Sequence, residues 1–226
     1  MGEFALGQAV PRFEDPRLLK GGGRYVDDMI FPRLAFGHVL RSPHAHARIR
    51  AIDTSRAKTA PGVLAVLTGA DWQASGWEDL PAAGGMKRPG GLASYRPRFP
   101  ALVDDRVRWV GDYVAFVVAE TKAQAADAAE LIEVEYDPLP AIVSTAGAVM
   151  PGAPLVWDDC PDNVCFVHEV GDKGAVERAF AQAAHIVKRR IVINRVTAAA
   201  MEPRGSIGAY STADGRYTIY TTLQRT

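Results

Sequence analysis

The sequence predicts an α+β protein of two domains, and three observations lead to that prediction. A strand, a capped helix and a second strand follow one another between residues 113 and 136, which is typical of a compact mixed unit. A stretch rich in proline, glycine and alanine then runs from Ala146 to Pro154, where we expect a domain boundary. Beyond it the chain closes on a β-hairpin, which the Asp214-Gly215 turn indicates.

Composition and charge restrict the class of protein. The chain has 226 residues, enough for two modest domains with a core. Its 26 basic residues equal its 26 acidic ones, so nothing favours a nucleic-acid partner or an acidic membrane surface. No apolar run approaches the roughly 20 residues that span a bilayer. Residues 1–7 lack the basic start and apolar core of an export signal, so we expect a cytoplasmic protein without a membrane span.

The first half of the chain alternates short strands with breaks. Asp53 can cap a short helix over residues 54–60, which Pro61-Gly62 stops. Residues 73 to about 100 contain many turn formers and little periodicity, which predicts a long loop of the kind often found at interfaces or sites. The strands predicted before this loop are Phe36–Arg41, Arg48–Asp53 and a buried strand over Val63–Leu67.

The unit that follows the long loop has the strongest local signals. Tyr113–Ala119 is a continuous apolar run, and Thr121 with Gln124 forms the pattern of a capping box for the helix after it. That helix is rich in alanine, so it can lie close on a sheet. Leu131–Tyr136 alternates as a strand, whose Glu133 and Glu135 are more typical of a solvated face than of paired catalytic acids.

The second half is predicted to contain one more helix and four strands. Asp172 can cap a helix over Lys173–Ala184 that carries one apolar stripe. The predicted strands are Val164–Val170, a long twisted strand over Ile186–Val196, and the hairpin strands Ser206–Tyr210 and Arg216–Leu223.

Several residues could have a chemical role, and for each of them a structural role is the alternative. His44 and His46 could bridge a metal from one strand face, but no third ligand is near and a structural role is favoured. Cys160 and Cys165 cannot alone complete an iron–sulfur or zinc site, so packed thiols in a reducing compartment are expected.

Two further features have similar alternatives. Gly21-Gly22-Gly23 could cradle a phosphate, yet a plain turn is favoured because no helix clearly begins after it. Glu202 is a possible buried acid, and an ion pair with Arg204 would explain it without catalysis.

Several stretches in the same order make the whole chain resemble the N-terminal part of the molybdopterin-binding large subunit of the xanthine dehydrogenase, aldehyde oxidase and aerobic carbon monoxide dehydrogenase family. They are Arg12–Arg17, Gly21–Asp28, Arg41–Ala47, Pro61–Thr68, Val110–Ala119, Ala128–Pro140 and Met201–Gly205. The resemblance implies an α/β hammerhead domain over residues 18–140. It also implies the incomplete start of a molybdenum-cofactor-binding domain over residues 150–226.

The resemblance assigns one cofactor contact to this chain. Gln224 matches the family glutamine at the apical oxo ligand of molybdenum, where a neutral amide can donate a hydrogen bond without changing the charge of the centre. The glycine-and-phenylalanine loop, the pterin-binding glutamine motif and the catalytic glutamate of the family lie further along. We therefore expect no catalytic residue and no direct metal ligand here, and Glu202 is not given the role of the base.

By the same resemblance, the activity is oxidative hydroxylation of an aldehyde, an N-heterocycle or carbon monoxide, with water as the oxygen source. The [2Fe-2S] clusters and FAD would lie on partner chains, an iron–sulfur subunit and an FAD subunit. The downstream part of the molybdenum subunit would be a further partner, without which this piece is inactive. The alternative is a non-catalytic interaction or assembly module that docks the iron–sulfur and flavin partners.

Overall fold

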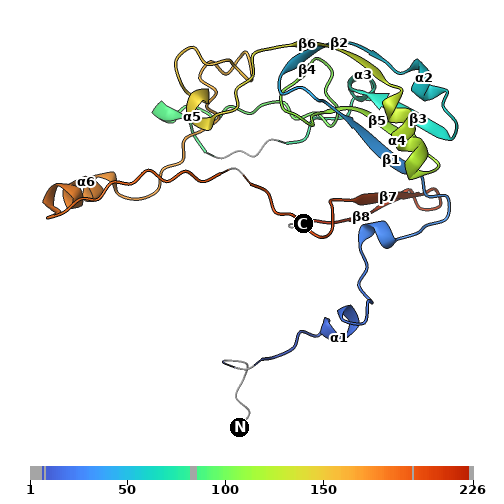
Figure 1. Ribbon diagram of the computed structural model, residues 1–226, viewed down its shortest axis with the longest axis horizontal. Coiled ribbons are helices and arrows are strands. Elements are labelled where there is room, and N and C mark those ends of the chain that lie inside the picture. Colours follow the sequence, from blue (N-terminus) through green and yellow to red (C-terminus); the bar gives the residue numbers. More distant parts are fainter. Residues whose placement is uncertain (1–6, 8, 82–85, 195, 224–226) are drawn as a thin grey trace. The chain divides into compact units, whose positions relative to one another are not determined.

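The computed structural model describes residues 7, 9–81, 86–194 and 196–223 of the chain. They form two compact units, drawn in Figure 1: residues Ala35–Ile186, and residues Met1–Leu34 together with Val187–Thr226. We call them the central unit and the terminal unit. In the described part of the chain, none of the helices has the length and apolarity needed to cross a membrane.

The central unit is built on two three-stranded sheets in which every pairing is antiparallel. The strand orders are β1-β5-β3 and β4-β2-β6. The strands are β1 (Phe36–Arg41), β2 (Ala47–Asp53), β3 (Val63–Thr68), β4 (Arg106–Val107), β5 (Tyr113–Ala119) and β6 (Glu133–Pro138). Strands β5 and β6, adjacent in the predicted strand–helix–strand pattern, therefore belong to different sheets.

Strand β5 is buried on both faces, which explains its continuous apolar sequence. Ala115 and Val117 belong to one buried cluster, with residues of the helix α4 and of β3. Val114, on the opposite face, belongs to a second cluster with Ala47 and Val107. The alternation of side chains along one strand thus links the two cores of the unit.

Helix α4 (Lys122–Glu130) packs its alanines on the first sheet. Its start agrees with the predicted cap, because the Thr121 hydroxyl oxygen accepts a hydrogen bond from the Gln124 backbone N–H at 3.2 Å. The Gln124 side chain accepts from the Thr121 hydroxyl at 2.9 Å, instead of reaching the backbone N–H as it would in a full capping box. Ala125, Ala128 and Ala129 are buried, so the close approach predicted for this helix is confirmed.

Short elements complete the central unit. The helix predicted after Asp53 is present, and the Asp53 carboxylate accepts from the Ser55 N–H at 2.8 Å. The predicted cap of the last helix is also present, since the Asp172 side chain accepts from the Ala175 N–H at 2.9 Å. These elements are α2 (Ser55–Lys58), α3 (Gly69–Ala74), η2 (Pro89–Gly91), α5 (Thr145–Ala148) and α6 (Lys173–Gln182).

Three strand predictions need correction. The strand predicted as buried over Val63–Leu67 is β3 at a sheet edge, where Val66 is 5% exposed but Leu64 is 59% exposed. Val164–Val170 forms no strand, because only Val167 makes a bridge, to Lys87 of the long loop. The described residues of Ile186–Val196 are not a strand either. β-branched residues favour extended backbone, but a strand also needs a hydrogen-bonded neighbour, and the described residues supply none for this range.

The terminal unit joins the two ends of the chain. From the first end come α1 (Asp15–Leu18) and the 3-10 turn η1 (Val26–Asp28), and from the second come β7 (Ser206–Ser211) and β8 (Arg216–Thr221). The two strands form the predicted hairpin, with Tyr210 opposite Tyr217 and Gly215 in the left-handed conformation at φ 67°. Gly21 lies in a plain turn, as predicted.

Gly69 is a position where the core leaves no room for a side chain. A Cβ atom there would lie 2.3 Å from the backbone oxygen of Val103, which cannot rotate away. We expect Gly69→Ala to lower the free energy of unfolding by about 1–3 kcal/mol, the usual cost of overpacking. The control is Gly147→Ala, whose Cβ would meet Ser144 at an ordinary 3.4 Å. Urea unfolding should separate the two variants, and equal midpoints would contradict the steric argument.

Candidate functional site

The end of strand β8 leads to Gln224, the residue assigned to the cofactor, which lies outside the described residues. Two hydrogen bonds hold the chain just before it. The Thr222 N–H donates to the Gly205 carbonyl oxygen at 3.2 Å, and the Gly205 N–H donates to the Thr222 hydroxyl oxygen at 3.1 Å. The hairpin end is therefore fixed to the Met201–Gly205 stretch two residues before Gln224.

The Met201–Gly205 stretch is itself held by the first end of the chain. Oε1 of Glu202 accepts a hydrogen bond from the Val26 N–H at 2.9 Å, across 176 positions of sequence. The rings of Phe31 and Tyr220 make a second contact between these two parts of the terminal unit, with centroids 5.0 Å apart. Two of the stretches that carry the family resemblance, Gly21–Asp28 and Met201–Gly205, are thus brought together in space.

This arrangement corrects the role suggested for Glu202. Among the described residues no ion pair joins Glu202 to Arg204, and the carboxylate instead satisfies a backbone donor. Val26 begins the 3-10 turn η1, whose first N–H groups have no partner within the turn. A carboxylate is suited to such a position, so Glu202 acts as a structural cap from a distant segment.

His44 and His46 make separate contacts. Nδ1 of His46 lies 2.9 Å from the carbonyl oxygen of Pro140, and the His44 ring packs on Tyr136 with centroids 4.8 Å apart. Both contacts are of the structural kind favoured from sequence. In the part of the chain that the structure describes, no group of three or more His, Cys, Asp or Glu side chains is placed to hold a metal ion.

The cysteines are unpaired thiols. Cys160 is buried and Cys165 is half-buried. Burial raises the pKa of the Cys160 thiol, and the neighbouring Asp162 carboxylate raises it further. Because the thiolate is the reactive form, Cys160 is a poor nucleophile. Glu133 is also without a catalytic setting, since it forms an exposed ion pair with Arg56 at 3.3 Å.

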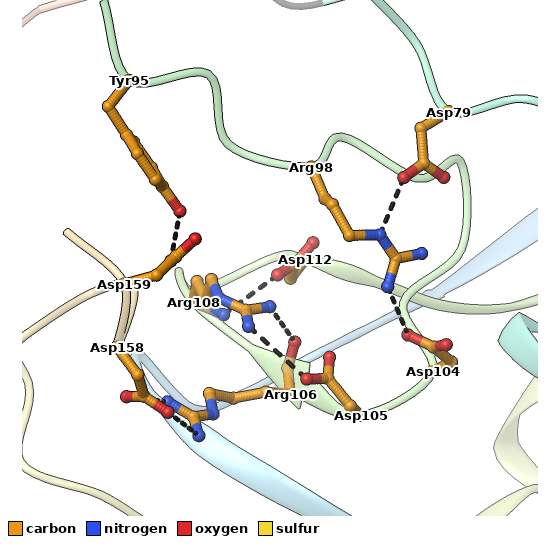
Figure 2. Close-up of polar contacts among 10 residues, drawn as sticks. All are labelled: Asp79, Tyr95, Arg98, Asp104, Asp105, Arg106, Arg108, Asp112, Asp158 and Asp159. Carbon is orange, nitrogen blue, oxygen red and sulfur yellow. Dashed lines mark hydrogen bonds and ion pairs between the residues drawn. The ribbon is translucent and has the colours of Figure 1, made fainter. Parts of the chain in front are cut away.

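Sequence reasoning missed a cluster of charged and aromatic side chains in the central unit, which Figure 2 shows. Arg106 donates two hydrogen bonds to Asp158, each 3.0 Å long, and the Tyr95 hydroxyl donates to Asp159 at 2.6 Å. The Arg108 guanidinium lies 3.7 Å from the ring centroid of Trp157. These contacts attach residues 157–159 to strand β4 and to the long loop. The available signal was the Arg106-Val107-Arg108 spacing, which places two cations on one face of an extended segment but does not indicate their partners.

A second set of contacts, made by Arg98, holds another part of the long loop. Arg98 donates to Asp79 at 2.8 Å and lies 3.8 Å from Asp104 (Figure 2). The residues of the predicted loop that are described, 73–81 and 86–100, contain only the short elements α3 and η2, so the loop prediction is confirmed. Ion pairs and aromatic contacts give this loop a defined place on the sheets.

Asp158, Asp112 and Tyr95 in this cluster have shifted pKa values. The pKa of Asp158 is lowered because Arg106 donates to its ionised form. Burial raises the pKa of Asp112, although the N–H groups of Arg108 and Tyr113 donate to its carboxylate and act in the opposite direction. Burial, with Asp159 second, raises the pKa of Tyr95. The Tyr95 hydroxyl therefore stays protonated and serves as a hydrogen-bond donor.

Comparison with known proteins places these features in a family. Residues 20–140 match the family model "Aldehyde oxidase and xanthine dehydrogenase, a/b hammerhead domain", and residues 156–226 match "Molybdopterin cofactor-binding domain". The predicted α+β fold, a hammerhead domain followed by the start of a molybdenum-cofactor-binding domain, is confirmed by these matches.

Curated relatives and solved structures agree with the family models. The carbon monoxide dehydrogenase large chain of Afipia carboxidovorans is 37% identical over 94% of this chain and 26% of its own length. The nicotine 6-hydroxylase large subunit of Paenarthrobacter nicotinovorans is 36% identical over 97% of this chain and 26% of its own. The crystal structure of quinoline 2-oxidoreductase from Pseudomonas putida 86 superposes with a TM-score of 0.82 at 34% identity, over 99% of this chain and 27% of that one. The chain thus spans about a quarter of the length of these proteins.

Glu202 provides a test of the contact between the two ends of the chain. Replacing it by alanine leaves the Val26 N–H without its acceptor, which should lower the free energy of unfolding by about 1–2 kcal/mol. The change Glu202→Gln keeps an oxygen acceptor and should cost less. Hydrogen exchange at the Val26 amide should be faster in the alanine variant than in the glutamine variant. Equal exchange in the two variants would show that the contact does not hold the terminal unit together.

The ion pair between Arg106 and Asp158 should contribute to stability in a pH-dependent way. Because the folded-state pKa of Asp158 is lowered, its contribution is present above the ordinary aspartate pKa of 3.8 and is lost as the pH falls through the folded-state pKa. We expect Asp158→Asn to lower the free energy of unfolding at pH 7 by no more than about 1 kcal/mol, because the carboxylate is exposed. The difference should vanish in strong acid, as urea titrations across this range would measure. An Asp158→Asn effect that persists in an Arg106→Gln background would contradict the pairing.

Proposed function

This chain belongs to the aldehyde oxidase and xanthine dehydrogenase family, and on that premise we propose that it forms the N-terminal part of the large subunit of a molybdenum hydroxylase. The observation that carries the proposal is the match of residues 156–226 to the molybdopterin cofactor-binding domain. That match includes the β7–β8 hairpin and Gln224 at its end. We propose domain limits of 18–140 for the hammerhead domain and 150–226 for the part of the cofactor domain present here.

The proposed reaction is oxidative hydroxylation of an aldehyde, an N-heterocycle or carbon monoxide, with water as the oxygen source. The names of two relatives, a carbon monoxide dehydrogenase and a nicotine hydroxylase, support a substrate of this general kind. When bound, the molybdenum cofactor supplies a two-electron acceptor. This chain contributes a positioned amide and a framework to that chemistry.

The donor chemistry of the hairpin end fits a molybdenum–oxo group. Gln224 follows Thr222, which is fixed by two hydrogen bonds to Gly205. A neutral amide N–H can donate to an oxo ligand and leaves the charge of the metal centre unchanged. Anchoring the backbone nearby limits the positions that this amide can take, which is what a positioning residue needs.

The rest of the site is proposed to come from other polypeptide segments. A further part of the large subunit would complete the cofactor pocket and supply the base, because this chain spans 26% of its curated relatives. Partner subunits with [2Fe-2S] clusters and FAD would remove the electrons. We place the assembly in the cytoplasm, where the free thiols of Cys160 and Cys165 would stay reduced.

The test is a substitution of Gln224 in a complete large subunit assembled with its iron–sulfur and FAD subunits. Gln224→Ala should lower turnover by about 10- to 100-fold, the usual effect of losing a group that hydrogen-bonds to a metal ligand. Molybdenum and pterin content should stay within error of the wild type, as measured by elemental analysis and by pterin fluorescence after oxidation. The matched control is Gln73→Ala, an exposed glutamine of α3 that should leave turnover unchanged.

Two results would refute parts of this proposal. An unchanged rate in Gln224→Ala would remove Gln224 from the cofactor site. An assembly that binds the iron–sulfur and FAD subunits, yet contains neither molybdenum nor pterin, would instead identify the chain as a non-catalytic docking module.

A further inference from the structure

A side-chain hydroxyl replaces a backbone acceptor where the β7–β8 hairpin ends. The last strand pair is Ser206 with Thr221, and the next pair along would be Gly205 with Thr222. The Thr222 N–H donates to the Gly205 carbonyl oxygen at 3.2 Å, as in a regular antiparallel pair. In such a pair the return bond runs from the Gly205 N–H to the Thr222 carbonyl oxygen. Here the Gly205 N–H donates to the Thr222 hydroxyl oxygen, at 3.1 Å.

The hydroxyl bond affects the direction in which the chain leaves the hairpin. A carbonyl oxygen bonded in the ladder keeps its peptide group in the plane of the sheet, so the strand continues. A threonine hydroxyl that bonds to a nearby backbone group competes with this pattern and lets the strand end. Two residues span at most about 7 Å. The direction of the backbone at Thr222 therefore decides where the Gln224 amide can reach.

Gly205, the partner of this hydroxyl, is itself held in place. A Cβ atom on Gly205 would lie 3.4 Å from Cγ1 of Val26, so the glycine lies against the Val26 side chain. The Val26 N–H donates at 2.9 Å to Glu202, three residues before Gly205. The Thr222 hydroxyl thus accepts from a backbone group whose own position is fixed by the first end of the chain.

We propose that Thr222 is a positioning residue for Gln224, and that its hydroxyl ends the ladder after Thr221 and directs the chain toward the molybdenum cofactor. This inference rests on the proposed function, in which the Gln224 amide serves the cofactor. Thr222 acts through that amide by fixing the backbone before it. Valine has nearly the same shape as threonine but lacks the hydroxyl. Thr222→Val therefore favours the regular bond from the Gly205 N–H to the carbonyl oxygen of residue 222, which lengthens the ladder and moves Gln224.

The test uses the complete large subunit assembled with its iron–sulfur and FAD subunits. Thr222→Val should lower kcat by about 10-fold and leave KM unchanged, since misplacing a group that acts on the reaction slows turnover. Thr222→Ser keeps the hydroxyl and should have the wild-type kcat. The matched control is Thr218→Val, the same change at an exposed threonine of β8, which should also keep the wild-type kcat.

Two further measurements separate positioning from a merely structural role. In a Gln224→Ala background, Thr222→Val should have no additional effect on kcat, because the group that it positions is gone. An equal loss of kcat in both backgrounds would overturn the inference. The EPR spectrum of the molybdenum centre should change in Gln224→Ala and in Thr222→Val, since both alter a hydrogen bond to a metal ligand, and should not change in Thr222→Ser.

The outcomes distinguish this inference from the proposed function. If Gln224→Ala lowers kcat and Thr222→Val does not, Thr222 is not a positioning residue, and the role of Gln224 stands. If Gln224→Ala leaves kcat unchanged, the role of Gln224 fails and the inference fails with it. A lower molybdenum content in Thr222→Val, with wild-type turnover per molybdenum, would also overturn the inference, because a residue needed only for folding has that effect.

Discussion

The burial of strand β5 on both faces is the constraint on which the central unit depends. Val114 faces one cluster while Ala115 and Val117 face the other, so a single strand joins two cores. Its neighbours β1 and β3 pair with it along most of its length. The alanines of α4 let that helix lie close enough to seal one side. The charged cluster of the central unit is positioned by this framework.

Local signals explain why much of this framework could be predicted. Thr121 before the alanine helix, Asp53 before α2 and Asp172 before α6 all accept backbone hydrogen bonds at helix starts, and each is visible within three residues of sequence. The hairpin followed from its Asp214-Gly215 turn. Strand predictions failed where the structure depends on a hydrogen-bonded neighbouring strand from elsewhere in the sequence. Residues 186–194 have strand-forming side chains, yet a strand is defined by its neighbour, which no local pattern contains.

The site was predicted unevenly for the same reason. Gln224 came from the family resemblance, and physical reasoning on the residues alone treated it as an ordinary polar side chain. Glu202 was noticed as an acid before a proline, but its acceptor role toward Val26 depends on a contact 176 positions away. The pairs Arg106–Asp158 and Tyr95–Asp159, separated by 52 and 64 positions, were missed entirely. A single sequence does not show which distant residue a charged side chain will pair with. Capping and turn residues can be recognised because they bond to backbone groups a few positions away in the same sequence.

The contact between Val26 and Glu202 also sets an order of events during synthesis. Residues before Leu34 belong to the terminal unit, yet the other part of that unit begins only at Val187. At roughly 5–20 residues per second, the ribosome needs about 8–30 s to make the intervening chain. The central unit, whose residues are contiguous, can fold in that time. The segment before Leu34 therefore meets residues 187–226 only after the whole central unit has been synthesised.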